Sequence, residues 1–251
     1  MNKVIVIDVG FVMFRAILSF ASSKNTIPMA YTFMRMLVAG LKRIGIDYSD
    51  IIILAKDSPL GSWRRGIFSE YKANRKKNRE KQQDKDFWDE MWKEVDIIMD
   101  KINNSLSWHI ITVDKAEADD VAGVVCHVFK DKEIKLYTAD GDWSQLLQYP
   151  NVKLLSIITK KWIEKDNAIE VLNQKIEKGD KADNILGKPK DDKEREIRRQ
   201  IISLIDLPDF VEKPITEKLL NLPQKNIYWE RVPFKSIRKQ LQNLYEGGKN
   251  V

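Results

Sequence analysis

Cysteine and histidine are scarce in this chain of 251 residues, which contains one Cys and two His. A single Cys cannot form a disulfide within the chain, so a disulfide-stapled secreted scaffold is excluded and a reducing compartment fits. Cys126, His109 and His127 are also too few for a zinc site with four Cys or His ligands. We expect Cys126 to lie in a buried helix and both histidines to be structural.

Long apolar runs and export signals are missing as well. The longest apolar stretch, residues 28–41, is shorter than the ~20 residues that span a bilayer, and it contains Arg35. Asp8 interrupts the apolar N-terminal residues too early for a signal peptide. There is no phosphate-binding loop of the form GxxxxGK[ST], so an ATPase has no support. We therefore expect an intracellular protein with no membrane partner.

Hydrophobic residues make up 43% of the chain and charged residues 32%, which is enough apolar content for a folded core. Over the first two-thirds, short apolar runs alternate with longer amphipathic stretches. The runs predict strands at 4–7, 51–55, 109–113 and 134–138, and the stretches predict helices at 11–20, 29–44 and 121–129. This alternation predicts an α/β fold with a mostly parallel, doubly wound sheet.

Two regions break the alternation. Residues 63–101 have no strand pattern and are densely charged. From residue 179 onward prolines become frequent, and apolar residues in 191–206 recur at helical spacing. We therefore divide the chain into an α/β core, residues 1–178, and a small C-terminal helical region, residues 179–251, packed beside the sheet.

Acidic residues follow each of the four predicted strands. They are Asp8, Asp57, Asp114, Glu117, Asp119, Asp120, Asp140 and Asp142. The C-terminal edge of the strands is where ligand crevices form in open α/β sheets, so at least six carboxylates should meet there. Such a cluster repels itself unless cations neutralise it, and oxygen-only ligands select Mg²⁺ or Mn²⁺. Any one of these acids alone is more typical of a helix N-cap.

A strongly basic segment lies next to these acids in the sequence. Residues 64–85 contain nine basic and three acidic residues, a net charge of +6 that equals the net charge of the whole chain. Concentrated positive charge suits a phosphate backbone, and the interleaved Phe68 and Tyr71 could stack on unpaired bases. The alternative for a charge run in isolation is a solvated helix. Together with the acidic edge, the segment favours a nuclease.

Five motifs carry a resemblance to a known family. They are SEYKANRKKNR at 69–79, EADDVAG at 117–123, TADGDWSQLLQYPNVK at 138–153, KKWI at 160–163 and KGDKADNI at 178–185. In this order and spacing the chain resembles the structure-specific 5′-nucleases, which include flap endonucleases and 5′→3′ exonucleases. Within that family it is most similar to the phage-type ribonucleases H that remove RNA primers.

The resemblance implies roles for individual residues. The implied metal ligands for two ions are Asp8, Asp57, Glu117, Asp119, Asp120, Asp140, Asp142, Asp180 and Asp183. The implied catalytic residues are Lys72, Arg75, Asp119 and Asp140, with Lys72 and Arg75 gripping the scissile phosphate. The basic segment would form a helical arch at about 63–101. The implied nucleic-acid contacts are Arg64, Arg65, Tyr71, Lys72, Arg75, Lys76, Lys77, Arg79, Lys188 and Lys190.

The activity implied by the resemblance is Mg²⁺-dependent 5′→3′ exonuclease and flap endonuclease cleavage of DNA and RNA·DNA at 5′ ends, flaps or forks. Two Mg²⁺ ions, with Mn²⁺ as a substitute, would activate a water and stabilise the leaving 3′-oxygen. A single-strand-binding protein or a sliding clamp of a replisome would be the partners of a monomer in the cytoplasm, the host cytoplasm for a viral protein.

One departure and three alternatives stand beside this interpretation. Most relatives have a glycine-rich helix-hairpin-helix after the GD..DN block, whereas only Gly187 remains here, followed by a charged stretch. The duplex-binding contacts after Asp183 therefore stay open, and a solvated helix face is as good an account of Lys188 and Lys190. The alternatives are a catalytically silent DNA-binding protein, a compact RNA endonuclease, and a phosphohydrolase acting on small molecules.

Overall fold

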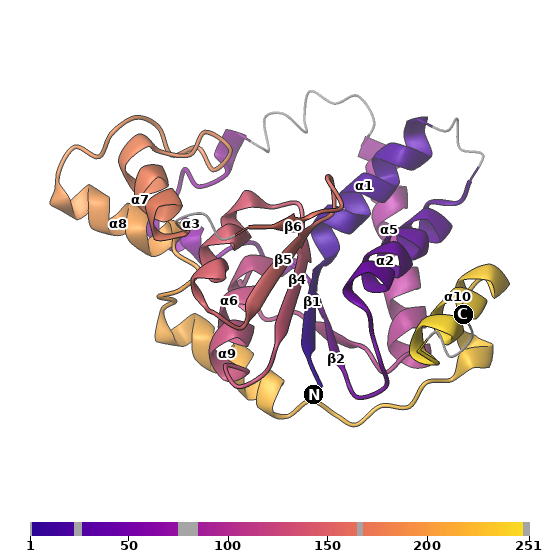
Figure 1. The fold of residues 1–251 in the computed structure, drawn as a ribbon. Helices are drawn as coiled ribbons and strands as arrows, with labels where there is room; N and C mark the ends of the chain where they lie inside the picture. Colours follow the sequence, from indigo (N-terminus) through magenta and orange to yellow (C-terminus); the bar gives the residue numbers. More distant parts are fainter. Residues whose placement is uncertain (1, 23–26, 75–84, 165–167, 248–251) are drawn as a thin grey trace.

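A six-stranded sheet forms the centre of the computed structural model, which describes residues 2–22, 27–74, 85–164 and 168–247. The strand order is β3-β2-β1-β4-β5-β6, parallel throughout except for β6, which pairs antiparallel with β5 (Figure 1). The strands are β1 (Val4–Asp8), β2 (Ile51–Ala55), β3 (His109–Ile111), β4 (Ile134–Thr138), β5 (Val152–Ser156) and β6 (Trp162–Ile163). The predicted α/β fold with a mostly parallel sheet is confirmed.

The central strand β1 is apolar on both faces because helices cover both sides of the sheet. Ile5 and Ile7 point into one core, and Val4 and Val6 point into the other. A continuous β-branched run is the expected sequence for a parallel strand buried on both faces.

Helices lie on both faces of the sheet and at one end of it. They are α1 (Val9–Ser22), α2 (Met29–Ile44), α3 (Arg64–Ile67), α5 (Lys85–Ser105), α6 (Ala118–Val128), α7 (Ala168–Lys178), α8 (Asp192–Ile202), α9 (Asp209–Leu220) and α10 (Lys235–Tyr245). Two 3₁₀ helices, η1 (Gly141–Gln148) and η2 (Trp229–Arg231), complete the elements.

The C-terminal helices divide between the two faces. Helices α1, α2, α5 and α10 share one core, and α6 and α9 share the other (Figure 1). Helices α7 and α8 form a third, smaller cluster beside η1 and α3, built on Leu172, Ile176, Ile201 and Ile202. The helices after residue 179 are therefore packed against the sheet and its neighbours, on both faces.

The structure refines several predicted elements. Helix α6 begins three residues before the predicted helix 121–129, because Glu117 and Asp120 close it with a capping box. The short strands β5 and β6 were not predicted. In the range 63–101, Met91 and Val95 are buried in the core from α5, so the second half of that range belongs to the body of the protein. No helix in the described ranges is long and apolar enough to cross a membrane.

Candidate metal centre

The predicted acidic residues meet at the C-terminal edge of the parallel strands. Asp8 ends β1, Asp57 follows β2, and Asp140 follows β4. The carboxylates of Asp8 and Asp57 both flank Gly10, where an added Cβ would lie 3.4 Å from Asp8 Oδ1 and 3.9 Å from Asp57 Oδ2. The Asp57 carboxylate also accepts a hydrogen bond of 2.8 Å from the backbone N–H of Ala118, which fixes the start of α6 beside β2. Parallel pairing thus gathers acids that are far apart in sequence.

These carboxylates lie close to one another, and burial together with their mutual repulsion shifts the pKa values of Asp8 and Asp119. Burial raises the pKa of Asp8 to about 7, against hydrogen bonds from Thr138 and Phe11, and the charges of Asp57 and Asp140 raise it further. Burial and then Asp140 also raise the pKa of Asp119 well above its usual range. Asp8 is only 4% exposed. A group of neighbouring like charges with one member buried this deeply calls for a cation.

Lys72 supplies one such cation. Its Nζ lies 2.6 Å from Glu117 Oε1, and its charge also lowers the pKa of Asp119 and Asp140 against the effect of burial. Burial disfavours the Glu117 carboxylate too, but Lys72 and Arg64 hold its pKa at about 2. The Lys72 backbone has a φ of 55° and donates an N–H to the carbonyl of Asp183 at 3.0 Å. An ammonium group therefore sits against the first acidic group.

A second group contains Asp142, Asp180 and Asp183, which each offer a carboxylate oxygen within 4.8 Å of the other two. The Nζ of Lys175 in α7 bonds to Asp142 and lies 2.7 Å from Asp180 Oδ2. Burial would lower the pKa of Lys175, but Asp142 and Asp180 raise it above its usual range. The second acidic group is thus also paired with the ammonium group of a lysine side chain.

Both groups fit divalent metal ions by their chemistry. The donors are carboxylate oxygens, which are the ligands that Mg²⁺ and Mn²⁺ prefer. The residues that could hold one ion are Asp8, Asp57, Glu117, Asp119 and Asp140, and those that could hold another are Asp142, Asp180 and Asp183. Each group already has a lysine ammonium ion-paired with its carboxylates, which shows that positive charge stabilises the acids there.

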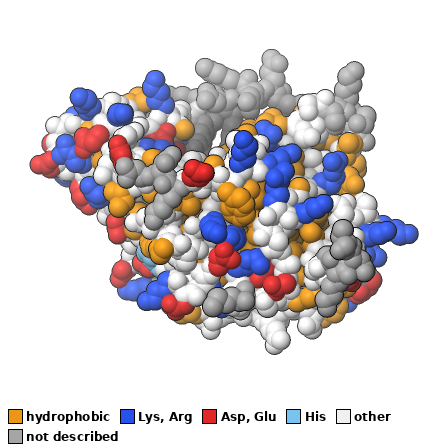
Figure 2. Space-filling view, viewed as in Figure 1, with side chains coloured by type: hydrophobic (Ala, Val, Ile, Leu, Met, Phe, Trp, Pro, Cys, Tyr) orange, Lys and Arg blue, Asp and Glu red, His pale blue; other side chains and the backbone are white. Residues whose placement is uncertain are grey.

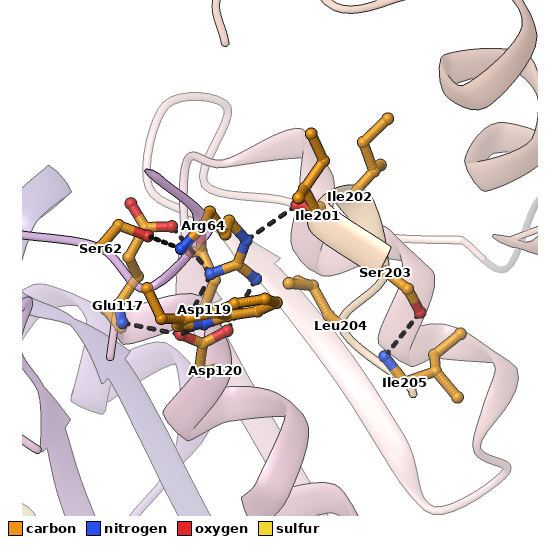
Figure 3. Close-up of polar contacts among 12 residues, drawn as sticks. Ser62, Arg64, Glu117, Asp119, Asp120, Ile201, Ile202, Ser203, Leu204 and Ile205 are labelled. Atoms are coloured by element: carbon orange, nitrogen blue, oxygen red, sulfur yellow. Dashed lines mark hydrogen bonds and ion pairs between the residues drawn. The ribbon is translucent and has the colours of Figure 1, made fainter. Parts of the chain in front are cut away.

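Asp120 lies away from this cluster, and its predicted role as a metal ligand is a poor fit. Its side chain is 0% exposed, and both oxygens are taken. Oδ1 accepts from Arg64 at 2.7 Å, and Oδ2 accepts from Trp63 Nε1 at 3.0 Å and from the Glu117 backbone at 2.8 Å (Figure 3). Because Arg64, Trp63 and the Glu117 backbone bond to its two oxygens, this buried carboxylate anchors the start of α6 to α3.

Two predicted nucleic-acid contacts are corrected on the same ground. Arg64 is 1% exposed and pairs with Asp120 and Glu117, so its guanidinium cannot reach a phosphate. Tyr71 is 2% exposed and donates its hydroxyl to Glu117 Oε2 at 3.0 Å, so its ring offers no face to a base. Charge and aromatic character in the sequence do not distinguish a buried anchor from a surface contact.

Other predicted basic contacts remain available or untested. Arg65, Lys188 and Lys190 are exposed. Arg75, Lys76, Lys77 and Arg79 lie outside the described residues. In Figure 2, basic side chains gather toward the centre and right of the face shown, whereas acidic ones are more frequent on the left and below. Of the eight acids in the two groups, three are buried, four are half-buried and Asp57 is exposed.

The structure adds residues that the sequence did not single out. Lys175 closes the second acidic group from a helix more than thirty residues after Asp142. Thr138 donates its hydroxyl to Asp8 Oδ2 at 2.6 Å, and Trp143 donates its Nε1–H to Asp119 Oδ1 at 2.7 Å. A buried Trp needs an acceptor, so Trp143 beside two acids was a usable signal. Lys175 carried none, because only the packing of α7 on η1 brings it to the site.

Because Asp8 is buried, replacing it by the neutral residue asparagine should stabilise the folded protein by an amount that depends on pH. The folded protein holds the Asp8 proton up to a pKa of about 7, whereas the unfolded chain releases it near 3.8. Stability from this group is therefore full below pH 3.8 and lost as pH rises to 7. In EDTA, the free energy of unfolding of Asp8→Asn should exceed that of the wild type by a margin that grows toward pH 7, up to about 4 kcal/mol. Urea unfolding at each pH measures it, and a margin that is constant with pH would contradict a charged, buried Asp8.

Comparison with known proteins identifies the family and supports the fold. A family model described as 5′-3′ exonuclease, N-terminal resolvase-like domain, matches residues 3–177. Ribonuclease H of Enterobacteria phage T4 is 33% identical over 144 residues, which are 56% of this chain and 47% of that protein. The chain thus matches about half the length of this curated relative.

Two solved structures share the fold. One is T5 5′-exonuclease with bound zinc ions, with a TM-score of 0.61, 19% identity, and coverage of 88% of this chain and 99% of that chain. The other is the bacteriophage T5 flap endonuclease in a pseudo-enzyme-product complex with DNA and metal ions, with a TM-score of 0.61, 20% identity, and coverage of 97% and 88%. At these identities the structures support the fold, and the matched model supports the family. This chain belongs to the family of 5′-3′ exonuclease N-terminal resolvase-like domains.

Proposed function

We propose that this protein is a Mg²⁺-dependent 5′→3′ exonuclease and flap endonuclease acting on 5′ ends of DNA and RNA·DNA, and that it removes RNA primers during replication. The single observation that carries the proposal is the pair of acidic groups at the C-terminal edge of the sheet, each ion-paired with a lysine. The relatives support it by their names, which are ribonuclease H, 5′-exonuclease and flap endonuclease.

The metal-binding residues proposed here are the eight carboxylates of the two groups, without Asp120. Two bound ions, when present, would lower the pKa of a water and stabilise charge on the leaving 3′-oxygen. Thr138 and Trp143 hold the Asp8 and Asp119 carboxylates in place through their hydrogen bonds of 2.6 and 2.7 Å. Such hydrogen bonds fix the orientation of ligating carboxylates.

Lys72 and Arg75 are proposed to hold the scissile phosphate. The position of Lys72 supports this proposal, because its ammonium faces the first acidic group and its backbone is bonded to Asp183 of the second. A phosphate oxygen entering the site would offer Lys72 a further anionic partner beside Glu117. The ammonium would then neutralise charge that develops on the phosphate during cleavage.

The main alternative is a DNA-binding protein that retains the site but does not cut. The set of eight carboxylates disfavours it, because a binding protein has no need to gather so many like charges next to a phosphate backbone. Replisome partners, such as a single-strand-binding protein or a sliding clamp, and a monomeric state remain predictions from the family resemblance.

A cleavage assay with two substrates tests the proposed function. A 5′-labelled DNA flap and a 5′-labelled RNA·DNA hybrid are each incubated with Mg²⁺ and, separately, with EDTA. We expect Mg²⁺-dependent release of short labelled products from at least one substrate, leaving a 5′-phosphate on the remaining strand. Binding of the flap with no cleavage in Mg²⁺ or Mn²⁺ would favour the non-cutting alternative.

A further inference from the structure

Arg64 is a buried cation directly behind the first acidic group. Its Nη2 donates to Asp120 Oδ1 at 2.7 Å, and its Nη1 donates to Glu117 Oε2 at 2.9 Å and to Asp120 Oδ2 at 3.1 Å (Figure 3). The guanidinium also lies over the Trp63 ring, with Cζ 4.6 Å from the ring centroid. Because the planar Arg64 guanidinium is hydrogen-bonded to both carboxylates, it fixes their positions.

The two carboxylate oxygens of Glu117 face different surroundings, one the protein interior and the other the site. Oε2 accepts from Arg64 Nη1 at 2.9 Å and from the Tyr71 hydroxyl at 3.0 Å. Oε1 accepts from Lys72 Nζ at 2.6 Å. Because two interior donors occupy Oε2, Oε1 is the oxygen presented to the cation at the site. Without that arrangement the carboxylate could rotate.

Arg64 also ties the site to the C-terminal helices. Its Nε–H donates to the carbonyl of Ile201 at 2.8 Å, near the C-terminus of α8. The last carbonyls of a helix have no partner within the helix and favour a nearby positive charge. The loop after α8 also lies tightly on α6, since a Cβ added to Gly123 would come within 2.2 Å of the Leu204 carbonyl. One side chain therefore joins α3, α6 and α8.

We propose that Arg64 is a positioning residue for metal binding: it neutralises Asp120 and holds Glu117 so that one oxygen faces the first metal ion. The inference rests on the proposed function, because it assigns Arg64 a part in the same site. It differs from the family-based expectation, in which the basic residues of this segment contact nucleic acid. Arg64 contacts neither metal nor substrate and acts through Glu117.

Arg64→Lys isolates geometry from charge. Lysine keeps the positive charge but cannot form the planar fork to two carboxylates and a carbonyl. The matched control is Arg198→Lys in α8, since Arg198 is also buried and bonds to the carbonyls of Ile176 and Gly187, with no contact to the acidic cluster. Both variants are compared for thermal unfolding, Mn²⁺ binding by electron paramagnetic resonance without nucleic acid, flap binding in EDTA, and single-turnover cleavage across Mg²⁺ concentrations.

For Arg64→Lys we expect Mn²⁺ affinity to fall about tenfold or more, the usual effect of removing a partner that orients a metal ligand. Cleavage at low Mg²⁺ should fall with it and recover in part at high Mg²⁺, while flap affinity in EDTA stays at the wild-type value. Arg198→Lys should lose thermal stability with no change in Mn²⁺ affinity. Should Arg64→Lys fail to fold, the double variant Arg64→Met with Asp120→Asn carries the test, because it removes the Arg64 bond to Glu117 and leaves no unpaired charge on Asp120.

Unchanged Mn²⁺ affinity in a folded Arg64→Lys protein would overturn the proposal and leave Arg64 a core ion pair. If Arg64→Lys does not fold, unchanged Mn²⁺ affinity in the folded double variant would do the same. A wild-type protein that binds Mn²⁺ but cuts no 5′ end would remove the proposed function, and the Mn²⁺ titration would still decide the role of Arg64.

Discussion

Replacing Asp140 and Asp142 together by asparagine should abolish cleavage of a 5′ flap while leaving flap binding intact. Asp142 belongs to the second acidic group and Asp140 to the first, so the variant should weaken the sites for both ions. The expected loss of rate is at least about a thousandfold, beyond the loss from removing one stabilising donor of a transition state. Single-turnover cleavage and fluorescence anisotropy of a labelled flap measure the two effects separately.

The fold should survive this double replacement because asparagine keeps the local hydrogen bonds. Asp140 Oδ1 accepts from the Asp142 backbone at 2.8 Å at the start of η1, and an asparagine carbonyl can accept there as well. Asp209→Asn with Glu217→Gln on α9 is the matched control, since both acids are exposed and the charge change is the same. If flap affinity collapses while cleavage per bound complex persists, Asp140 and Asp142 are structural.

Lys72→Ala should reduce cleavage about 10²- to 10³-fold with little loss of flap affinity. The Lys72 ammonium lies 2.6 Å from Glu117, where it can meet the scissile phosphate, whereas overall affinity comes from many surface cations. Alanine keeps the backbone bond to the Asp183 carbonyl and tolerates the φ of 55° about as well as lysine does. The effect should therefore come from the missing charge.

Lys72→Met is the second variant for this position, because it keeps the length of the side chain without its charge and should match Lys72→Ala. The readouts are the single-turnover rate at saturating protein and the dissociation constant of the flap in EDTA. A drop in affinity that accounts for the whole drop in cleavage would reduce Lys72 to one phosphate contact among many.

The strand ends were predictable because local pattern and topology agree there. Apolar β-branched runs followed by acids predicted the strands and the acids at their ends. Parallel pairing of the strands then brings these acids to one edge of the sheet. Asp119 and Asp120 show the limit. They are neighbours on α6, about 100° apart around the helix, so one faces the cluster and the other faces Arg64. The sequence names both acids but not which way each points.

The positions of Arg64 and Lys175 in the site could not be predicted from the sequence for a related reason. Arg64 stands in a run of basic residues, and only the approach of α8 and α6 distinguishes it from its exposed neighbour Arg65. Lys175 lies on a helix whose packing against η1 is a tertiary contact with no local pattern. The short strand β5 was missed because its apolar residues are few and interrupted by the exposed Lys153. Function here depends on contacts between distant segments.

The anomalous signal of Mn²⁺ in a crystal of the protein tests the central claim most directly. Two sites are expected, one at the group of Glu117, Asp119 and Asp8, and one at Asp142, Asp180 and Asp183. The ammonium groups of Lys72 and Lys175 should lie farther from the carboxylates in that crystal than the contacts described above. No Mn²⁺ at either group, with both lysines still bonded to their acids, would show that the lysines are permanent counter-ions and would contradict a metal-dependent nuclease.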